Sequence, residues 1–220
     1  MKALVVGATG RTGRRIVEEL VERQIPVVAG VRDRQKAEDL LPPGVEIKLA
    51  NVSQPETLAA AIADCTVILC ATGATPGLNP LEPYWVDYEG TKNLIEAAKS
   101  ASIEQFVLVS SLCVSQLFHP LNLFWLILYW KQQAERYLQD SGLTYTIVRP
   151  GGLKESSEEE VFPVISGPDT LFEGSIPRKQ VAQICVEALH QANAHNKILE
   201  VVARPLSSPP SLVELFTALS

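Results

Sequence analysis

Runs of apolar residues alternate with amphipathic segments along almost the whole chain. Short runs rich in β-branched residues predict strands over Ala3–Val6, Val27–Val31, Val45–Leu49, Val67–Ala71, Phe106–Val109, Thr144–Val148 and Ile198–Val202. Apolar residues at helical spacing predict helices over Thr12–Arg23, Pro55–Ile62, Val86–Lys99, Lys131–Gln139 and Arg178–His190. Strands that are apolar throughout are buried on both faces, so the pattern predicts an α/β fold with a doubly wound parallel sheet.

The size of the chain indicates one domain. A length of 220 residues with 46% hydrophobic content is enough for one buried core. We expect residues 153–220 to add a small substrate-side lobe with a last strand and a helix over Leu212–Leu219, preceded by a proline-rich linker.

Charge and cysteine usage exclude several classes of function. The net charge of -6 argues against a nucleic-acid partner. The four cysteines show no metal-ligand spacing, so no metal site is expected, and reduced thiols with no export signal predict a cytoplasmic location. A helix that spans a bilayer needs about 20 apolar residues, and the apolar run Leu121–Lys131 has only about half that length. The sequence therefore predicts no membrane span.

The first strand leads into the segment GATGRTG, Gly7 to Gly13. Glycines at this spacing, between a buried strand and an amphipathic helix, are typical of a loop that binds the pyrophosphate of a dinucleotide. The expected contacts are Gly7, Thr9, Gly10, Arg11, Thr12 and Gly13.

The second strand leads into VRDRQK, which bears on the choice between NADP and NAD. An arginine here accommodates a 2′-phosphate, whereas an acidic residue binds the ribose hydroxyls. Arg32 and Lys36, with Arg11, favour NADP(H), while Asp33 argues for NAD and surface charge without a ligand is the alternative. Later strand ends are expected to add contacts from Asn51, Val52, Ala71, Thr72, Gly73, Ser110, Pro150 and Gly151.

Several further segments resemble one superfamily in order and spacing. GATGRTG, VRD, VDYEGTKNLIEAAK, FVLVSS, YTIVRPGGL and IPRKQVA are similar to the short-chain dehydrogenase/reductases, in their atypical branch. Within it the chain most resembles NADPH-dependent flavin and biliverdin-IXβ reductases, and also NADP-binding proteins of cyanobacteria and plastids. The resemblance implies a Rossmann fold, NADP(H) and a small planar acceptor such as a flavin or bilin.

The catalytic motif of that superfamily is incomplete here. Its usual Tyr-x-x-x-Lys pairs a proton-donating tyrosine with a lysine that binds the nicotinamide ribose; Lys131 matches the lysine, but Ile127 stands in place of the tyrosine. Tyr129 lies near the opposite face of a helix and cannot substitute unless the segment is not helical. Conjugated acceptors spread the incoming charge and need no positioned acid, so the missing tyrosine favours them. The resemblance implies that Lys131 binds the nicotinamide ribose. Ser111 could orient the acceptor or bond the carboxamide of the nicotinamide, or else be a structural serine at a strand end.

The stretch LNLFWLILYWK follows these serines and is rich in aromatic residues. Phe118, Trp125 and Tyr129, with Phe124 and Trp130, could form the wall of a substrate pocket, or else belong to the core or an oligomer interface. A rival hypothesis makes the protein an NADP-binding sensor or assembly factor whose aromatic face binds a protein. His119 is a possible proton donor, and Cys113 could sense oxidation if it is exposed.

Overall fold

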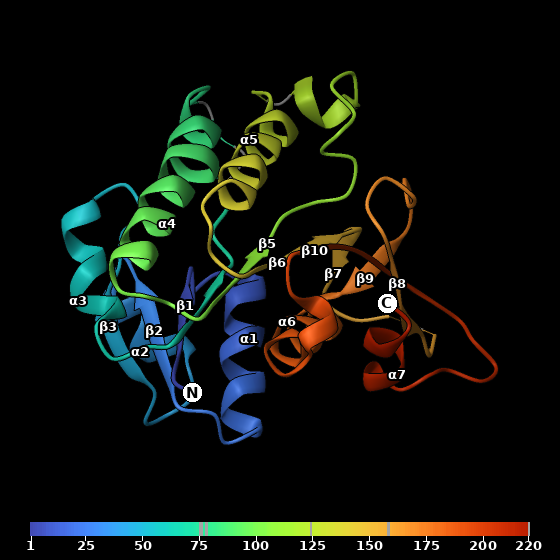
Figure 1. Cartoon of the computed structure of the whole chain (residues 1–220), viewed down its shortest axis with the longest axis horizontal. Helices are drawn as coiled ribbons and strands as arrows, with labels where there is room; N and C mark the ends of the chain where they lie inside the picture. Colours follow the sequence, from blue (N-terminus) through green and yellow to red (C-terminus); the bar gives the residue numbers. More distant parts are fainter. Residues whose placement is uncertain (75–76, 78, 124, 158, 220) are drawn as a thin grey trace.

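The computed structural model describes residues 1–74, 77, 79–123, 125–157 and 159–219. Within these residues an eight-stranded sheet has the order β3-β2-β1-β4-β5-β6-β10-β8 (Figure 1). Its strands are β1 (Ala3–Val6), β2 (Val27–Val31), β3 (Glu46–Leu49), β4 (Val67–Cys70), β5 (Gln105–Val109), β6 (Tyr145–Pro150), β8 (Phe162–Ser166) and β10 (Lys197–Arg204). Neighbours pair in parallel except β8, which runs antiparallel to β10. The predicted doubly wound parallel sheet is confirmed, with an antiparallel strand added at one edge.

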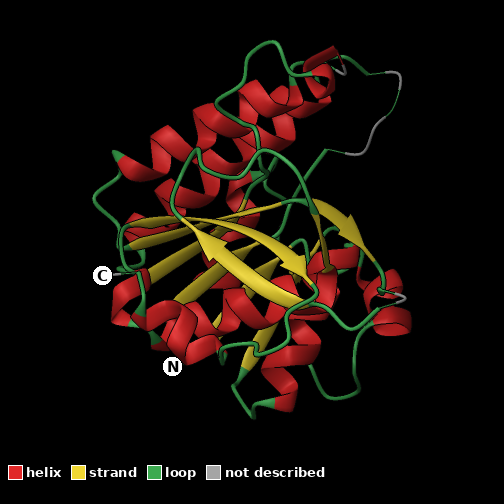
Figure 2. Ribbon diagram, turned by 90° about the vertical axis from the view of Figure 1, so that its right-hand side faces the viewer, coloured by secondary structure: helices red, strands yellow, loops and turns green. Residues whose placement is uncertain are grey.

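Helices cover both faces of the sheet (Figure 2). One face packs against α1 (Arg11–Glu22), α2 (Arg34–Leu40), α6 (Arg178–Glu187) and α7 (Leu212–Thr217). The other packs against α3 (Leu58–Ile62), α4 (Gly90–Ser100) and α5 (Ile127–Gln139). Successive residues of a strand point to opposite faces, so Ala3 and Val5 join the first core and Leu4 and Val6 the second. This double burial explains why β1 has no polar position.

The structure differs from the prediction around three helices. The unpredicted α2 begins directly after Asp33, whose carboxylate accepts a hydrogen bond from the Lys36 amide at 3.1 Å as a helix cap. A π-helical turn, Tyr84–Glu89, precedes α4, and α5 begins at Ile127, four residues before the predicted start. Short 3₁₀ turns occur at Pro55–Thr57, Pro120–Leu123, Ala188–His190 and Ala192–Ala194.

The C-terminal part of the chain is organised by strand pairs that the sequence pattern did not predict. The three-residue strands β7 (Gly152–Lys154) and β9 (Ser175–Pro177) pair in parallel to form a second, two-stranded sheet. β9 leads directly into α6, and a capping box between Ser211 and Glu214 starts α7. In the ranges described, no helix has the length and apolar character needed to cross a membrane.

Candidate functional site

A cleft of about 210 Å³ opens at the carboxyl ends of β1, β2, β3 and β4. In a parallel sheet these ends meet at one edge, where doubly wound folds bind ligands. The predicted cofactor residues that line it are Gly7, Thr9, Gly10, Arg32, Lys36, Asn51, Val52, Ala71, Thr72 and Gly73. Ala50, next to the predicted Asn51, lines it as well. Gly30, Val31, Ser53 and Val86 also line it and were not predicted, because they are apolar or small residues with no chemical signature.

The remaining predicted cofactor residues lie outside the cleft walls. Arg11, Thr12 and Gly13 form the first turn of α1, while Ser110, Pro150 and Gly151 follow β5 or end β6. Gly10 is the N-cap of α1, no side chain caps its amides, and its first turn has no acidic residue. Uncapped amides at a helix start are donors suited to phosphate, so the glycine loop fits the pyrophosphate of a dinucleotide.

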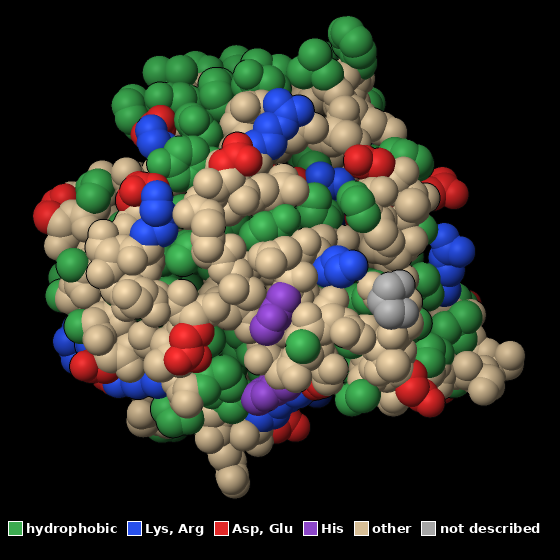
Figure 3. All heavy atoms as spheres, viewed as in Figure 1, with side chains coloured by type: hydrophobic (Ala, Val, Ile, Leu, Met, Phe, Trp, Pro, Cys, Tyr) green, Lys and Arg blue, Asp and Glu red, His purple; other side chains and the backbone are tan. Residues whose placement is uncertain are grey.

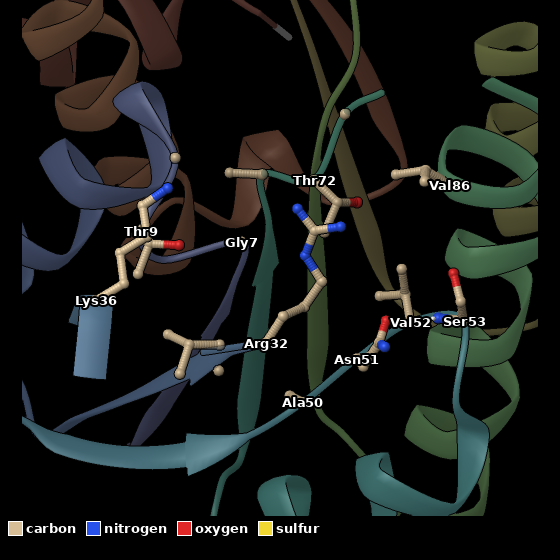
Figure 4. A pocket seen from close by; sticks show the side chains of 15 residues that line it. Gly7, Thr9, Arg32, Lys36, Ala50, Asn51, Val52, Ser53, Thr72 and Val86 are labelled. Carbon is tan, nitrogen blue, oxygen red and sulfur yellow. Dashed lines mark hydrogen bonds between the residues drawn. The ribbon is translucent and has the colours of Figure 1, made fainter. Parts of the chain in front are cut away.

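Positive side chains stand at the β2 end of the cleft. Figure 4 shows Arg32 rising from the end of β2 into the pocket, with Lys36 on the side of Thr9. The competing acid, Asp33, is not among the lining residues and instead caps α2. Arg34 also points elsewhere, because its Nε bonds to Glu38 Oε1 at 3.1 Å. The cleft therefore presents two cations to a ligand phosphate.

Arg32→Gln should weaken NADPH binding about tenfold to a hundredfold and leave NADH binding unchanged, because charge-assisted hydrogen bonds to phosphate contribute about 1.5–3 kcal/mol. Arg34→Gln removes the same charge outside the cleft and is the matched control. Dissociation constants from nucleotide fluorescence check both variants; an equal loss for NADPH and NADH in Arg32→Gln would contradict this role.

At the other end of the site, Lys131 of α5 forms an ion pair with Asp87. The two atoms Lys131 Nζ and Asp87 Oδ1 are 2.7 Å apart, and the Asp87 side chain is completely buried. Its second oxygen, Oδ2, accepts a hydrogen bond from the Ala74 amide at 3.2 Å. Both charged groups lie against Gly73, whose Cβ, if present, would be within 4 Å of each. Asp87 thus holds Lys131 beside the loop after β4, a pairing that no motif in the sequence indicates.

The structure shows where the superfamily's tyrosine would be expected. α5 is helical from Ile127, so Ile127 lies one turn before Lys131 and Tyr129 on a different side of the helix. The Tyr129 ring packs edge-on against Trp130, which in turn contacts Tyr84 and Tyr88 from the π-helical turn before α4. Tyr129 could act as the proton donor only if this segment were not helical, and the segment is helical.

A buried charge network lies beneath the serines that follow β5. Ser110 donates a hydrogen bond to Glu135, one turn after Lys131, and Arg149 Nη2 contacts Glu135 Oε2 at 2.7 Å. Arg149 also reaches Glu200 Oε1 at 3.3 Å. Burial opposes the charge of Arg149, but the hydrogen bond and charge of Glu135 raise its pKa. This network holds Ser110, while the neighbouring Ser111 is half-buried.

The described residues of the aromatic stretch are not among those that line the cleft. Phe118 is 97% exposed, and Trp125 is exposed while its Nε1 donates to the Gly77 carbonyl at 3.2 Å. Tyr129 and Trp130, on α5, are half-buried, and Phe124 lies outside the described residues. The side chain of Asn122 fixes this segment, because its Oδ1 accepts from the amides of Leu128 and Tyr129 at 3.0 and 3.1 Å. A substrate pocket formed by these aromatic residues stays a prediction.

Exposed apolar side chains gather over the starts of α4 and α5. We call this surface the apolar face; Figure 3 shows the hydrophobic side chains along the upper edge of the molecule. Its exposed members are Leu81, Trp85, Leu117, Phe118, Leu121, Leu123, Trp125 and Leu126. Exposed apolar patches of this kind are typical of interaction surfaces.

Two further candidates have structural roles here. The His119 Nδ1 accepts a hydrogen bond from the Leu121 amide at 3.2 Å, which stabilises the loop. Cys113 is buried, its Sγ contacts the Phe172 carbonyl oxygen at 3.3 Å, and burial raises its pKa. Oxidation sensing by Cys113 requires an exposed thiol, and the Cys113 side chain is buried in the structure.

Comparisons with known proteins agree with this geometry. A family model described as NAD(P)H-binding matches residues 7–192. An uncharacterised chloroplast protein of Arabidopsis thaliana is 45% identical over 99% of this chain and 82% of its own length. Sanguinarine reductase of Eschscholzia californica is 30% identical over 93% of this chain and 90% of its own length. Protein TIC 62 of A. thaliana chloroplasts is 38% identical over 96% of this chain, which spans only 37% of that relative.

Solved structures show the same architecture. A candidate NAD-dependent epimerase/dehydratase of Bacillus halodurans superposes with a TM-score of 0.88 at 28% identity and covers 99% of both chains. The anaerobilin reductase ChuY of Escherichia coli O157:H7 gives a TM-score of 0.75 at 26% identity, over 94% of this chain and all of that chain. The predicted Rossmann-like fold is confirmed. The narrower grouping with flavin and biliverdin-IXβ reductases and the cytoplasmic location stay predictions, and two of the plant relatives are chloroplastic.

Proposed function

Because the chain belongs to the NAD(P)H-binding family, we propose that it is an NADPH-dependent reductase that passes hydride to a flavin, a bilin or a similar conjugated acceptor. The family supports NADP(H) as the cofactor, and two of the similar proteins are reductases by name, one of sanguinarine and one of anaerobilin. The acceptor class goes beyond these findings and depends on the residues of the site.

The observation that carries the acceptor class is Ile127 one helical turn before Lys131. Reduction of a ketone builds charge on one oxygen, which requires a positioned acid. An acceptor with an extended conjugated system spreads the charge and can take its proton from water afterwards. A site that keeps the lysine and lacks the tyrosine favours the second kind of acceptor.

Each part of the site then has a distinct task. The glycine loop would hold the pyrophosphate, Arg32 and Lys36 the 2′-phosphate, and Lys131 the nicotinamide ribose. Bound NADPH would supply the hydride, while the chain positions the cofactor and the acceptor. Ser111, half-buried just after β5, would orient the acceptor.

NADPH oxidation by the purified protein tests this function, with FMN, riboflavin, biliverdin isomers, sanguinarine, a quinone and a simple ketone offered in turn. We expect turnover with at least one conjugated acceptor, well above the rate without protein, and none with the ketone. The matched controls are NADH in place of NADPH and a reaction without protein. Reduction of the ketone and of no conjugated acceptor would show that the proposed acceptor class is wrong.

A second candidate function rests on the apolar face. Phe118 at 97% and Leu123 at 83% exposure leave large apolar side chains in water. We infer that a protein with little turnover could use this face to bind another protein. Tight NADPH binding with no reduction of any acceptor, together with loss of a captured partner in Phe118→Ser, would favour this function over the first.

A further inference from the structure

Arg178, the first residue of α6, is buried without a complete set of partners. The residue is 8% exposed, and its Nη1 donates to Glu155 Oε1 at 2.9 Å. Its Nε is buried and has no hydrogen-bond partner among the described residues. A buried guanidinium is stable only when charge and hydrogen bonds compensate its lost hydration, so the single bond to Glu155 leaves Arg178 under-satisfied.

Its partner, Glu155, is shared with a second arginine. Arg11 Nη1 lies 3.8 Å from Glu155 Oε1, and the Glu155 side chain is 49% exposed. Arg15 approaches Glu155 at 4.0 Å but has a closer partner in Glu18 at 2.7 Å. Burial lowers the pKa of Arg178; Glu155 opposes this shift and the nearby Arg11 adds to it. Two guanidinium groups therefore share one half-exposed carboxylate.

This cluster lies between the cofactor loop and the C-terminal sheet. Arg11 lies within the glycine segment as the first residue of α1, and Glu155 directly follows β7. β9 pairs with β7, and Arg178 directly follows β9 as the first residue of α6. Helices α1 and α6 pack against each other (Figure 1). An anion held here would belong to a molecule that reaches from the cofactor toward the C-terminal segment.

We propose that Arg178 and Arg11 form a subsite for an acid group, carboxylate or phosphate, on the acceptor. This inference deepens the proposed function and rests on it for the identity of the ligand. Glu155 acts as an internal anion that occupies the two guanidinium groups until the acceptor's acid group displaces it. Once Glu155 is displaced, Arg178 donates charge-assisted hydrogen bonds to the acid group, including one from Nε.

FMN and riboflavin test this subsite, because they share the isoalloxazine ring and differ by one phosphate. We expect the complex of the protein with NADP⁺ to bind FMN about tenfold more tightly than riboflavin, measured by quenching of flavin fluorescence. Arg178→Gln should remove most of this preference, and Glu155→Gln should increase it. Lys179→Gln removes the neighbouring exposed charge and should leave the preference unchanged.

The alternative source of the acid group is the cofactor's own diphosphate. If Arg178→Gln weakens NADPH binding and leaves the ratio of FMN to riboflavin affinity unchanged, the cluster belongs to the cofactor site and the inference is wrong. Equal binding of FMN and riboflavin by the unaltered protein also overturns it. Because binding is measured without turnover, a clear FMN preference with no reduction would uphold the subsite while the proposed function fails.

Folding of the variants is checked separately. If Arg178→Gln is unstable, Arg178→Lys is compared with the unaltered protein instead. Arg178→Lys retains the positive charge, but a lysine cannot make the forked contact of a guanidinium. We expect Arg178→Lys to keep part of the preference for FMN. An Arg178→Lys variant that folds and shows the full FMN preference would contradict the proposed contact at Nε.

Discussion

Lys131→Ala should lower turnover by at least a hundredfold and also destabilise the fold by about 3 kcal/mol, because it leaves a buried carboxylate without its counter-ion. The Asp87 side chain is completely buried, and besides Lys131 it receives one hydrogen bond, from the Ala74 amide. Loss of activity in this variant alone would therefore not separate a role on the ribose from a role in folding.

The double variant Lys131→Ala with Asp87→Asn separates the two roles. Asparagine is neutral and can still accept the Ala74 hydrogen bond, so the double variant should recover most of the lost stability. It should not recover turnover, because no cation remains for the ribose. Urea unfolding and NADPH oxidation measure the two properties; recovery of turnover in the double variant would show that Lys131 serves only to neutralise Asp87.

Gly13→Ala should abolish NADPH binding. An added Cβ would lie 2.2 Å from the Gly7 carbonyl oxygen and 2.8 Å from the Gly7 carbonyl carbon, and both are backbone atoms of the loop itself. The loop or the start of α1 must move, at a cost of about 1–3 kcal/mol or more. Gly7 has little room to move, since even an added Cβ there would lie 2.9 Å from the backbone carbonyl of Ala71.

Gly167→Ala is the matched control for Gly13→Ala. Nothing lies within 4 Å of a Cβ at Gly167, and its φ is not in the left-handed region. Thermal unfolding and NADPH titration should therefore find this variant unchanged. A Gly13→Ala protein that binds NADPH normally would show that the close contact between α1 and the glycine loop is not needed for the cofactor.

The sequence predicted the sheet well because burial on both faces leaves a local pattern. Seven strands of the main sheet are rich in apolar residues, and their predicted boundaries agree with the structure within two residues at each end. β7 and β9 are three residues long and contain Gly152 and Pro177, so they have no period to detect. α2 was missed because its residues are mostly polar, although Asp33 before it was a capping signal.

Within the site, the predictable part was the part with local motifs. The glycine loop and Arg32 stand at fixed positions after strands, and the structure places them in one cleft. The ion pairs of Asp87 and Arg178 were not predicted, because their partners are 44 and 23 residues away in the chain. Nothing in a local pattern distinguishes such a charge from a solvated one. Only the fold brings them together.

Direct observation of hydride transfer tests the central claim. The protein is loaded with NADPH, or with NADPH deuterated at C4 of the nicotinamide, and mixed without oxygen with the best conjugated acceptor in a single turnover. We predict that acceptor reduction and NADPH oxidation proceed at one rate, that deuterium slows both, and that Lys131→Ala with Asp87→Asn abolishes both. Reduction no faster than in free solution would contradict the assignment as a reductase.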